Sequence, residues 1–515
     1  MYFVFVLPII KGLYFLLLML QQEHYSSFSL IRYFKKYYFG LPFVFCCYLT
    51  GLFFFKNSYA DLFVYVFVLV FSLIRVKYIV KLKFTKRIFR LSIVCVLLCL
   101  VPFLFSLSRS TFLLVVFLLP FIVLFSSLLI SPFEWIINNY YKNIAAKRLE
   151  KISPYVVCIT GSFGKTSVKR MLEEIYKSEY FVYATPKSYN TPMGIAKCVL
   201  NNMSGLSELF FCEAGATKKG DIREIVNMIK PNVGVITSIG YQHMSSFKSI
   251  DNVLKTKLEL LDGLGCDGKL VLNYGNEYLN GIESNDINEC IGVNKRYGKY
   301  YACNIKYDDV YTEFDIYSYN KFILHIKTKL LGDHNIDNIV LCYGVKKMLD
   351  DKFYLSDESF KSGVLKLCNV ENRLCLKSDV EGSNFRFLDD SFNSNTEGFV
   401  SAVNVLKRLN GIKCIITPGV VDGGSYSGYI NEKLVVSLNG LDDIVLVNNK
   451  EVKKLKMLLN KRNISYKCVD SYSEGVKYLK NKYSSFNDVF VNVLIENDLP
   501  DNYLMRWLYE FWRFG

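Results

Sequence analysis

A glycine-rich turn between an apolar run and a helical pattern is the feature that most constrains this chain. The residues Thr160-Gly-Ser-Phe-Gly-Lys-Thr-Ser167 follow the β-type run Tyr155–Thr160 and precede the helical pattern Val168–Ser178. Glycines at such a turn let backbone N–H groups face an anion, and the N-terminus of the helix adds its dipole. Lys165 would reach terminal phosphates, and the Thr166 hydroxyl would bind Mg²⁺. We therefore expect a phosphate-binding loop, with an ordinary strand-to-helix turn as the alternative.

Short apolar runs of β type alternate with helical patterns after Tyr140. Strands are expected at Leu209–Glu213, Val233–Ser238, Phe385–Asp389, Cys414–Pro418, Asp443–Val447 and Asp488–Val493. Helical patterns such as Thr396–Leu409 lie between them. This alternation is typical of parallel sheets covered by helices. The sequence therefore predicts an α/β fold in two parts, a P-loop-type parallel-sheet ATPase domain at 150–350 and a Rossmann-like α/β domain at 351–515.

The first 140 residues carry five long apolar runs, near 1–20, 38–55, 58–76, 91–108 and 111–131. Each run approaches the ~20 residues that cross a bilayer as a helix. The basic clusters follow the first, third and fifth runs, and basic residues collect on the cytoplasmic side of membrane proteins. The pattern predicts an N-terminal α-helical transmembrane segment of about five helices at 1–140. We therefore expect a multi-pass protein of the cell membrane with cytoplasmic catalytic domains, and a buried helical core of a soluble protein is the alternative.

The distribution of charge argues against a nucleic-acid partner. Residues 1–150 hold 16 basic and 4 acidic residues, so they contribute +12 of the net +15. The remaining residues hold 46 basic and 43 acidic side chains, without a basic stripe of the kind that lines a nucleic-acid groove. The 15 cysteines form no C-x-x-C pair. Neither a zinc ribbon nor a disulfide framework is expected, which fits a reducing cytosol.

Further motifs follow the glycine-rich turn in a fixed order. They are Ser188-Tyr-Asn-Thr-Pro-Met-Gly-Ile195, Glu213-Ala-Gly-Ala216 with Gly220-Asp-Ile222, Ile236-Thr-Ser-Ile-Gly240 with His243, Lys257-Leu-Glu259, Gly332-Asp-His-Asn335 with Asn338, and Asp389-Asp-Ser-Phe-Asn393. Together with the turn they resemble the motifs of the Mur ligase family, the ATP-dependent amide ligases of peptidoglycan precursor synthesis. Thr417-Pro-Gly419 resembles the branch of that family that adds D-alanyl-D-alanine. The resemblance covers about 150–425 well and the remaining C-terminus loosely.

The resemblance implies a reaction and the ions that it needs. A carboxylate would be activated by ATP as an acyl phosphate, and Mg²⁺ and a lysine would neutralise the charge on the transferring phosphoryl group. Thr166 and Glu213 would hold one Mg²⁺, and His243 with Lys257 would hold a second. Lys257 would act after carbamylation by CO₂, which supplies the oxygen ligands that Mg²⁺ prefers. Lys255 competes for this role, but the Lys-x-Glu spacing favours Lys257.

The resemblance also implies contacts with the nucleotide. They would come from Gly161, Ser162, Gly164, Lys165, Thr166, Ser167, Asn335, Asn338, Arg373 and Asp390. Lys165, His243 and Lys257 would be the catalytic residues. Simpler readings stay open for several of these side chains: Glu213 as a solvated carboxylate, Lys257 as a surface charge on a helix, and Asp390 as part of a turn cluster.

The chain departs from the family before the glycine-rich turn. Peptidoglycan ligases normally carry an N-terminal domain that holds the uridine nucleotide of the substrate, and here only about twenty residues separate the last apolar run from the strand at Tyr155. The acceptor would be a muramoyl peptide bound by the remaining domains, or a lipid-linked peptide at the membrane surface. The donor would be D-alanyl-D-alanine or a similar amino acid or dipeptide. A ligase for a poly-amino-acid acceptor and a non-catalytic, ATP-binding membrane scaffold for wall synthesis are the alternatives.

Overall fold

The computed structural model describes residues 3–22, 25, 82–105, 109–186, 189–241, 244–265, 267–280, 282, 289–294, 298–307, 311–367, 374–378, 384–391, 396–420, 427–448, 452–486 and 489–496. The chain divides into two compact units. One comprises Met1–Tyr140 with Pro500–Gly515, and the other comprises Tyr141–Leu499.

Helices form the described part of the first unit. They are α1 (Phe3–Gln22), α5 (Lys86–Leu100), the short 3₁₀ helix η1 (Val101–Leu104) and α6 (Arg109–Ile152), which continues into the second unit. Buried apolar side chains of the three α-helices, among them Leu18, Cys95 and Leu119, belong to one cluster. Arg90 of α5 pairs with Glu134 of α6 at 2.6 Å, so a charged pair lies within the apolar helices.

The prediction of a multi-pass protein of the cell membrane is wrong, and the number of helices in 1–140 stays a prediction because part of that segment lies outside the described residues. In the described part of 1–152, two helices, Lys86–Leu104 and Leu118–Ile152, are long and apolar enough to cross a membrane. Two such helices are weak support for a membrane protein, because core helices of soluble proteins meet the same criteria. The first, fourth and fifth predicted runs fall largely on described helices, namely α1, α5 with η1, and α6. Helix α6 extends past the fifth run to include Lys142 and Arg148. The runs predicted at 38–55 and 58–76 lie outside the described residues.

A parallel six-stranded sheet organises the start of the second unit. Its strand order is β2-β3-β1-β4-β5-β6. The strands are β1 (Tyr155–Thr160), β2 (Val182–Ala184), β3 (Leu209–Glu213), β4 (Val233–Ile236), β5 (Lys269–Asn273) and β6 (Glu289–Val293). The inner strands read as continuous apolar runs because helices bury both faces.

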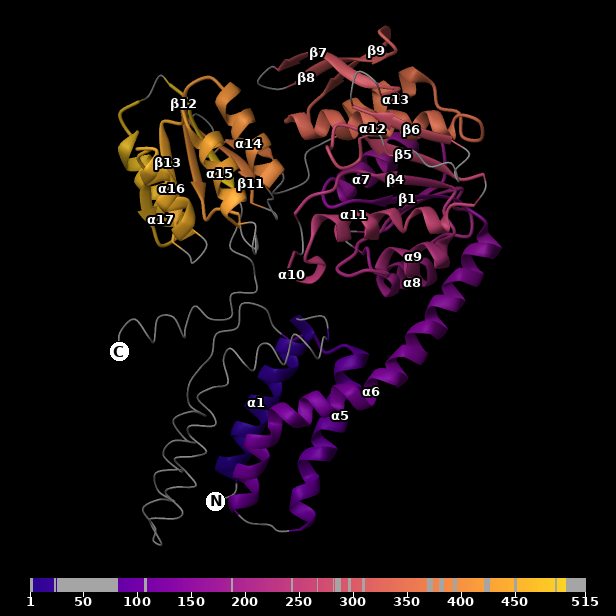
Figure 1. The fold of residues 1–515 in the computed structure, drawn as a ribbon, viewed down its shortest axis with the longest axis vertical. Coiled ribbons are helices and arrows are strands. Elements are labelled where there is room, and N and C mark those ends of the chain that lie inside the picture. The colour runs from indigo at the N-terminus through magenta and orange to yellow at the C-terminus, as the bar shows by residue number, and fades with distance from the viewer. Residues whose placement is uncertain are drawn as a thin grey trace. The chain divides into compact units, whose positions relative to one another are not determined.

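Alternate residues of β1 point to the two faces of this sheet. Val157 and Ile159 pack with α7 (Lys165–Tyr176), α12 (Asp333–Leu349) and α13 (Asp357–Leu365). Val156 and Cys158 pack on the other face with α8 (Pro192–Asn201), α9 (Asp221–Ile229), α11 (Ile250–Leu258) and the last turns of α6. Figure 1 shows α12 and α13 on one side of the sheet and α8 and α9 on the other. The short helices α10 (Met244–Phe247) and η2 (Leu261–Gly263) flank α11.

A three-stranded antiparallel sheet was missed by the sequence analysis. It consists of β7 (Tyr301–Tyr307), β8 (Thr312–Ser318) and β9 (Lys321–Thr328). Its buried side chains, such as Phe314 and Ile326, join the core around α12. The signal was present, because apolar and polar residues alternate along β8, as is typical of a half-buried strand.

A second six-stranded sheet has the order β10-β11-β15-β12-β13-β14, parallel except for β10. Its strands are β10 (Cys375–Ser378), β11 (Phe385–Asp390), β12 (Ile412–Thr417), β13 (Asp443–Val447), β14 (Lys467–Val469) and β15 (Val491–Glu496). The helices α14 (Thr396–Arg408), α15 (Ser427–Leu438), α16 (Val452–Lys461) and α17 (Tyr472–Lys482) pack against it. The predicted α/β class with parallel sheets is confirmed, and the domain limits 150–350 and 351–515 stay a prediction.

Candidate functional site: a glycine loop beside a buried carboxylate and a buried lysine

Two glycines let the loop after β1 turn closely against β4 and α12. Gly161 has φ +147°, and a Cβ there would lie 2.1 Å from the Thr237 hydroxyl oxygen. Gly164 has φ +82° at the N-cap of α7, and a Cβ there would lie 3.0 Å from Oδ1 of Asn338. Side chains rarely adopt such φ values, so both positions favour glycine. At these two positions no Cβ covers the loop backbone, and the first N–H groups of α7 that follow have no intrahelical acceptor.

Residues that follow β4 hold the loop in place. The Ser162 N–H donates to the Ser238 carbonyl at 2.7 Å, and the Phe163 N–H donates to the Ser238 hydroxyl at 3.0 Å. The Gly240 N–H donates to the Ser162 hydroxyl at 3.0 Å. The motif at 236–240 thus supports the loop through backbone and hydroxyl groups, a role that the sequence analysis did not assign to it.

Lys165 lies over the loop at the start of α7. Its ammonium donates to the carbonyls of Gly161 at 2.7 Å and Ser162 at 2.9 Å. Thr166 and Ser167 are partly buried in the same first turn. The loop, its lysine and the two hydroxyl residues therefore lie together at the carboxyl edge of the central sheet.

Glu213 ends the neighbouring strand β3 and is 1% exposed. Its Oε2 contacts the Lys169 ammonium at 3.0 Å, and its Oε1 accepts a hydrogen bond from the Asn190 amide at 3.1 Å. Burial by itself would raise the pKa of Glu213, but the Lys169 ammonium beside it, with smaller effects of Lys165 and Asn190, holds that pKa below its ordinary value. The carboxylate is therefore ionised in a site that water barely reaches.

Lys257 is buried near the end of α11, with 3% of its surface exposed. Among the described residues its amine has no hydrogen-bond or ion-pair partner. Burial lowers the pKa of Lys257 well below its ordinary value, and the charge of Lys165 lowers it further against the opposite effect of nearby carboxylates. A buried, readily deprotonated amine is the species that reacts with CO₂, so the donor chemistry fits a carbamate.

The remaining predicted residues fall in three places. Asn338 of α12 lies against Gly164, while the Asn335 amide donates to the Leu331 carbonyl at 2.8 Å. Asp390 ends β11 in the C-terminal sheet, in register with Glu496 of β15. His243 and Arg373 lie outside the described residues. Within the described ranges, no group of three or more His, Cys, Asp or Glu side chains is placed to hold a metal ion.

Two neighbours of predicted site residues escaped the sequence analysis. Lys169 contacts Glu213, and its position four residues after Lys165 on one helix face was the available signal. Glu496 faces Asp390 across two parallel strands. Burial, and then the charge and hydrogen bond of Asp390, raise the pKa of Glu496 well above its ordinary value. No local sequence pattern predicts the contact between Glu496 and Asp390, because the two strands are about a hundred residues apart in the sequence.

The residues present fit Mg²⁺ and a nucleotide. The two glycines leave backbone close to where phosphates would lie, the helix dipole of α7 favours an anion, and Lys165 supplies a charge. A hydroxyl and a carboxylate, Thr166 and Glu213, are hard oxygen donors of the kind that Mg²⁺ takes.

The glycine loop and the parallel sheet that carries it are similar to those of the Mur ligases. Residues 159–346 match the Mur ligase middle domain. The chain is a homologue of one branch of these enzymes, the UDP-N-acetylmuramoyl-tripeptide--D-alanyl-D-alanine ligases. The ligase of that name from Buchnera aphidicola subsp. Baizongia pistaciae is 26% identical over 358 residues, which cover 68% of this chain and 74% of the relative. The ligase from Haemophilus influenzae is 27% identical over 363 residues, which cover 68% and 73%.

Solved structures share the fold. MurF from Acinetobacter baumannii has a TM-score of 0.64 at 21% identity and covers 72% of this chain and 80% of its own. MurF from Thermotoga maritima, in complex with ADP, has a TM-score of 0.63 at 21% identity and covers 73% and 83%. The likeness at this level of identity is one of fold.

These relatives also overturn the predicted location in the cell membrane. The matched relatives are named UDP-N-acetylmuramoyl-tripeptide--D-alanyl-D-alanine ligases, and in the described part of this chain two helices are long and apolar enough to cross a membrane. Long apolar runs were interpreted as membrane spans from their length and composition, which are weak evidence when one or two helices meet the criteria.

Proposed function

We propose that the chain is an ATP-dependent, ADP-forming ligase that adds D-alanyl-D-alanine to UDP-N-acetylmuramoyl-tripeptide in peptidoglycan synthesis. The observation that carries this proposal is the arrangement of Lys165, Glu213 and Lys257 around the glycine loop. It occurs in a chain that is 26% identical over 358 residues to a ligase of that name. The two functional parts would be the nucleotide-binding domain at 150–350 and the C-terminal domain at 351–515.

The reaction would proceed in two steps. The tripeptide carboxylate takes the γ-phosphoryl group of ATP, which gives an acyl phosphate and ADP. The amine of the dipeptide then attacks the acyl carbon, the bond to phosphate breaks, and the amide and inorganic phosphate form after the amine loses a proton. Lys165 and the N-terminus of α7 stabilise the charge on the transferring phosphoryl group.

Thr166 and Glu213 would hold one Mg²⁺, and His243 with carbamylated Lys257 would hold a second. Bound Mg²⁺ supplies Lewis-acid stabilisation of phosphate charge. Lys257 contributes a neutral amine, because its depressed pKa lets it lose a proton before it reacts with CO₂. Asn335, Asn338, Arg373 and Asp390 would contact the nucleotide.

The region just before the glycine loop does not hold the usual N-terminal domain. Other parts of the chain must therefore bind the acceptor. Helix α6 ends at Ile152, and β1 begins at Tyr155, so no domain stands between them. We propose that the central and C-terminal domains hold the muramoyl peptide. A lipid-linked acceptor is the alternative within the same chemistry.

The test is phosphate release from ATP by the purified full chain with Mg²⁺ and bicarbonate. Release that requires both UDP-muramoyl-tripeptide and D-alanyl-D-alanine supports the proposal, and the Lys165→Ala variant is expected to abolish it. Release that occurs only with a lipid-linked acceptor would overturn the acceptor assignment. Absence of release with every acceptor, in a protein that still binds ATP, would overturn the ligase assignment.

A further inference from the structure

We infer that Lys169 is a positioning residue, which holds the Glu213 carboxylate in the orientation that binds the metal ion of the nucleotide. The inference rests on the proposed function, because it takes Glu213 as a metal ligand. Nothing in the sequence motifs assigned a role to Lys169.

The contact is built by two elements that meet beside the loop. Lys169 lies on α7, one turn after Lys165, and Glu213 is the last residue of β3. Both side chains are 1% exposed, and their Nζ and Oε2 atoms are 3.0 Å apart. The ion pair therefore ties the helix that begins at the phosphate loop to the strand that carries the carboxylate.

The second carboxylate oxygen is also fixed. Asn190 donates to Oε1 of Glu213 at 3.1 Å, and the Glu213 N–H donates to the Thr185 hydroxyl at 3.1 Å. Lys169 and Asn190 each use one lone pair of a different oxygen, and a carboxylate has about four such sites. Glu213 can therefore accept a cation while it keeps both protein contacts.

The contact with Lys169 decides how the Glu213 carboxylate is oriented. Without Lys169, the side chain of Glu213, which is 1% exposed, would keep the single contact of Oε1 with Asn190 and would be free to rotate about it. Lys165 is bonded to two loop carbonyls, so Lys169 is the cation in direct contact with the carboxylate. Partners of this kind orient metal ligands in other proteins, and their loss weakens metal binding by roughly 10- to 100-fold.

The experiment compares Mg²⁺-dependent ADP binding by the full chain and by Lys169→Met. ADP affinity is measured by calorimetry at increasing Mg²⁺, which gives the Mg²⁺ concentration of the half-maximal effect. We expect Lys169→Met to raise that concentration about tenfold, the usual scale for loss of a residue that supports a metal ligand. ADP affinity in excess EDTA should be unchanged, because the glycine loop and Lys165 remain.

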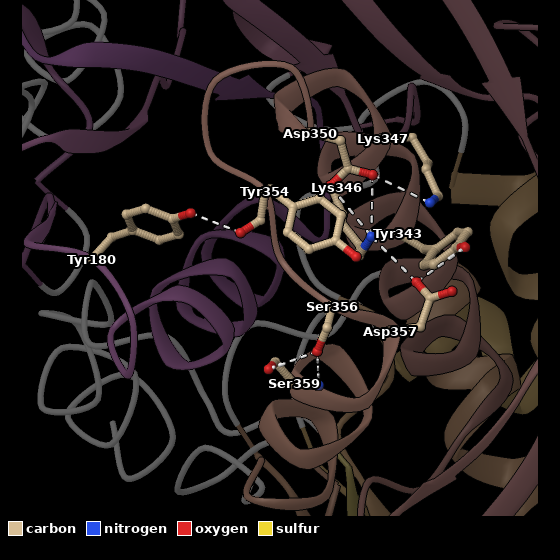
Figure 2. Close-up of polar contacts among 9 residues, drawn as sticks. All are labelled: Tyr180, Tyr343, Lys346, Lys347, Asp350, Tyr354, Ser356, Asp357 and Ser359. Atoms are coloured by element: carbon tan, nitrogen blue, oxygen red, sulfur yellow. Dashed lines mark hydrogen bonds and ion pairs between the residues drawn. The ribbon is translucent and has the colours of Figure 1, made fainter.

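Lys346 offers a matched control on the same unit. It is a buried lysine, 1% exposed, whose ammonium pairs with Asp350 at 3.1 Å and Asp357 at 3.2 Å. Figure 2 shows this cluster at the end of α12, with the ring of Tyr354 beside the lysine. Lys346 lies eight residues beyond Asn338, or about 12 Å along the helix at 1.5 Å per residue. Lys346→Met should lower the melting temperature and leave the Mg²⁺ dependence of ADP binding unchanged.

A double-mutant cycle separates orientation from general damage. Glu213→Gln should raise the Mg²⁺ requirement by itself, and Lys169→Met should add nothing in the Glu213→Gln background, because its target is gone. If Lys169→Met does not fold, Lys169→Leu, which also removes the donor to Glu213, takes its place in the same comparison.

Two results would overturn the inference. The first is a folded Lys169 variant whose Mg²⁺ requirement is unchanged. The second is a Lys169 substitution that raises the Mg²⁺ requirement as much in the Glu213→Gln protein as in the wild type. The readout is nucleotide binding and not ligation. A wild-type chain that binds Mg²⁺ and ADP as expected but ligates no acceptor would therefore defeat the proposed function and leave this inference standing.

Discussion

Glu259, just past the end of α11, accepts the backbone N–H of Gly220 at 2.8 Å, at the point where α9 begins. Its other oxygen accepts the N–H of Arg223 at 3.1 Å. The side chain is 4% exposed and caps α9 from a different element. Because Lys257 lies two residues earlier, this contact also fixes the segment that buries the lysine.

Glu259→Ala is expected to destabilise the protein by roughly 1–2 kcal/mol, the usual cost of removing a helix cap. It should also lower ligase activity, since the Lys257 segment loses its attachment to α9. Chemical denaturation and phosphate release measure the two effects. Asp262→Ala is the control, because its contact with Arg223 is exposed and should change stability little. Equal free energies of unfolding for Glu259→Ala and Asp262→Ala would contradict the capping of α9 by Glu259.

Gly164→Ala is expected to weaken ADP binding and to cost about 1–2 kcal/mol, since a left-handed backbone is strained for a residue with a Cβ. The new Cβ would also press on Asn338. Gly220→Ala is the matched control, because Gly220 has φ +93° and no atom within 4 Å of a Cβ. Gly220→Ala should lower the free energy of unfolding by a similar amount, because its backbone is strained in the same way, and should leave ADP affinity unchanged. Equal loss of affinity in both variants would contradict a special role for the loop.

Asp337 is expected to make stability depend on pH. Burial, with a smaller effect of Asp333, raises the pKa of Asp337 from 3.8 to about 7. Between these values the folded state holds more protons than the unfolded state, so this contribution to stability falls as pH rises through the window. Asp337→Asn should therefore stabilise the protein at pH 8 but not at pH 4. Denaturation at the two pH values measures the difference, and a difference independent of pH would refute the assignment.

Lys257→Ala is expected to lose ligase activity and to regain much of it in acetate. A small carboxylate can occupy the space of the missing side chain and supply the oxygen ligands that the carbamate would provide. Phosphate release in acetate, against chloride at equal ionic strength, measures the rescue. Lys165→Ala should not respond to acetate. Full activity of Lys257→Ala without any additive would exclude the carbamate.

Local pattern was enough to place the elements that carry the site. The strands Tyr155–Thr160, Leu209–Glu213 and Asp443–Val447 begin and end where the sequence predicted. Buried parallel strands are continuous apolar runs bounded by polar or glycine residues, so their limits are visible in a short window. Helix limits shifted by a few residues, since α7 begins at Lys165 inside the glycine-rich turn.

Hydropathy was least informative in the N-terminal third. The fifth run was predicted as a span at 111–131, and the helix that contains it is longer, Arg109–Ile152. Its apolar segment is followed by Lys142, Lys147 and Arg148 without a break in the helix. Length and composition do not determine what covers an apolar helix, because a membrane and a protein core favour the same residues.

The sequence by itself determined the local features of this protein: the glycine-rich turn after a buried strand, the alternation of strands and helices, and the order of the motifs. Short-range sterics and periodicity decide these, and both can be read within a few residues. Only the tertiary structure paired Lys169 with Glu213 and set Glu259 on the start of α9. Each contact joins residues about forty positions apart that lie on different elements of the fold. Packing brings these elements together, and burial there makes an unpaired charge or N–H group costly.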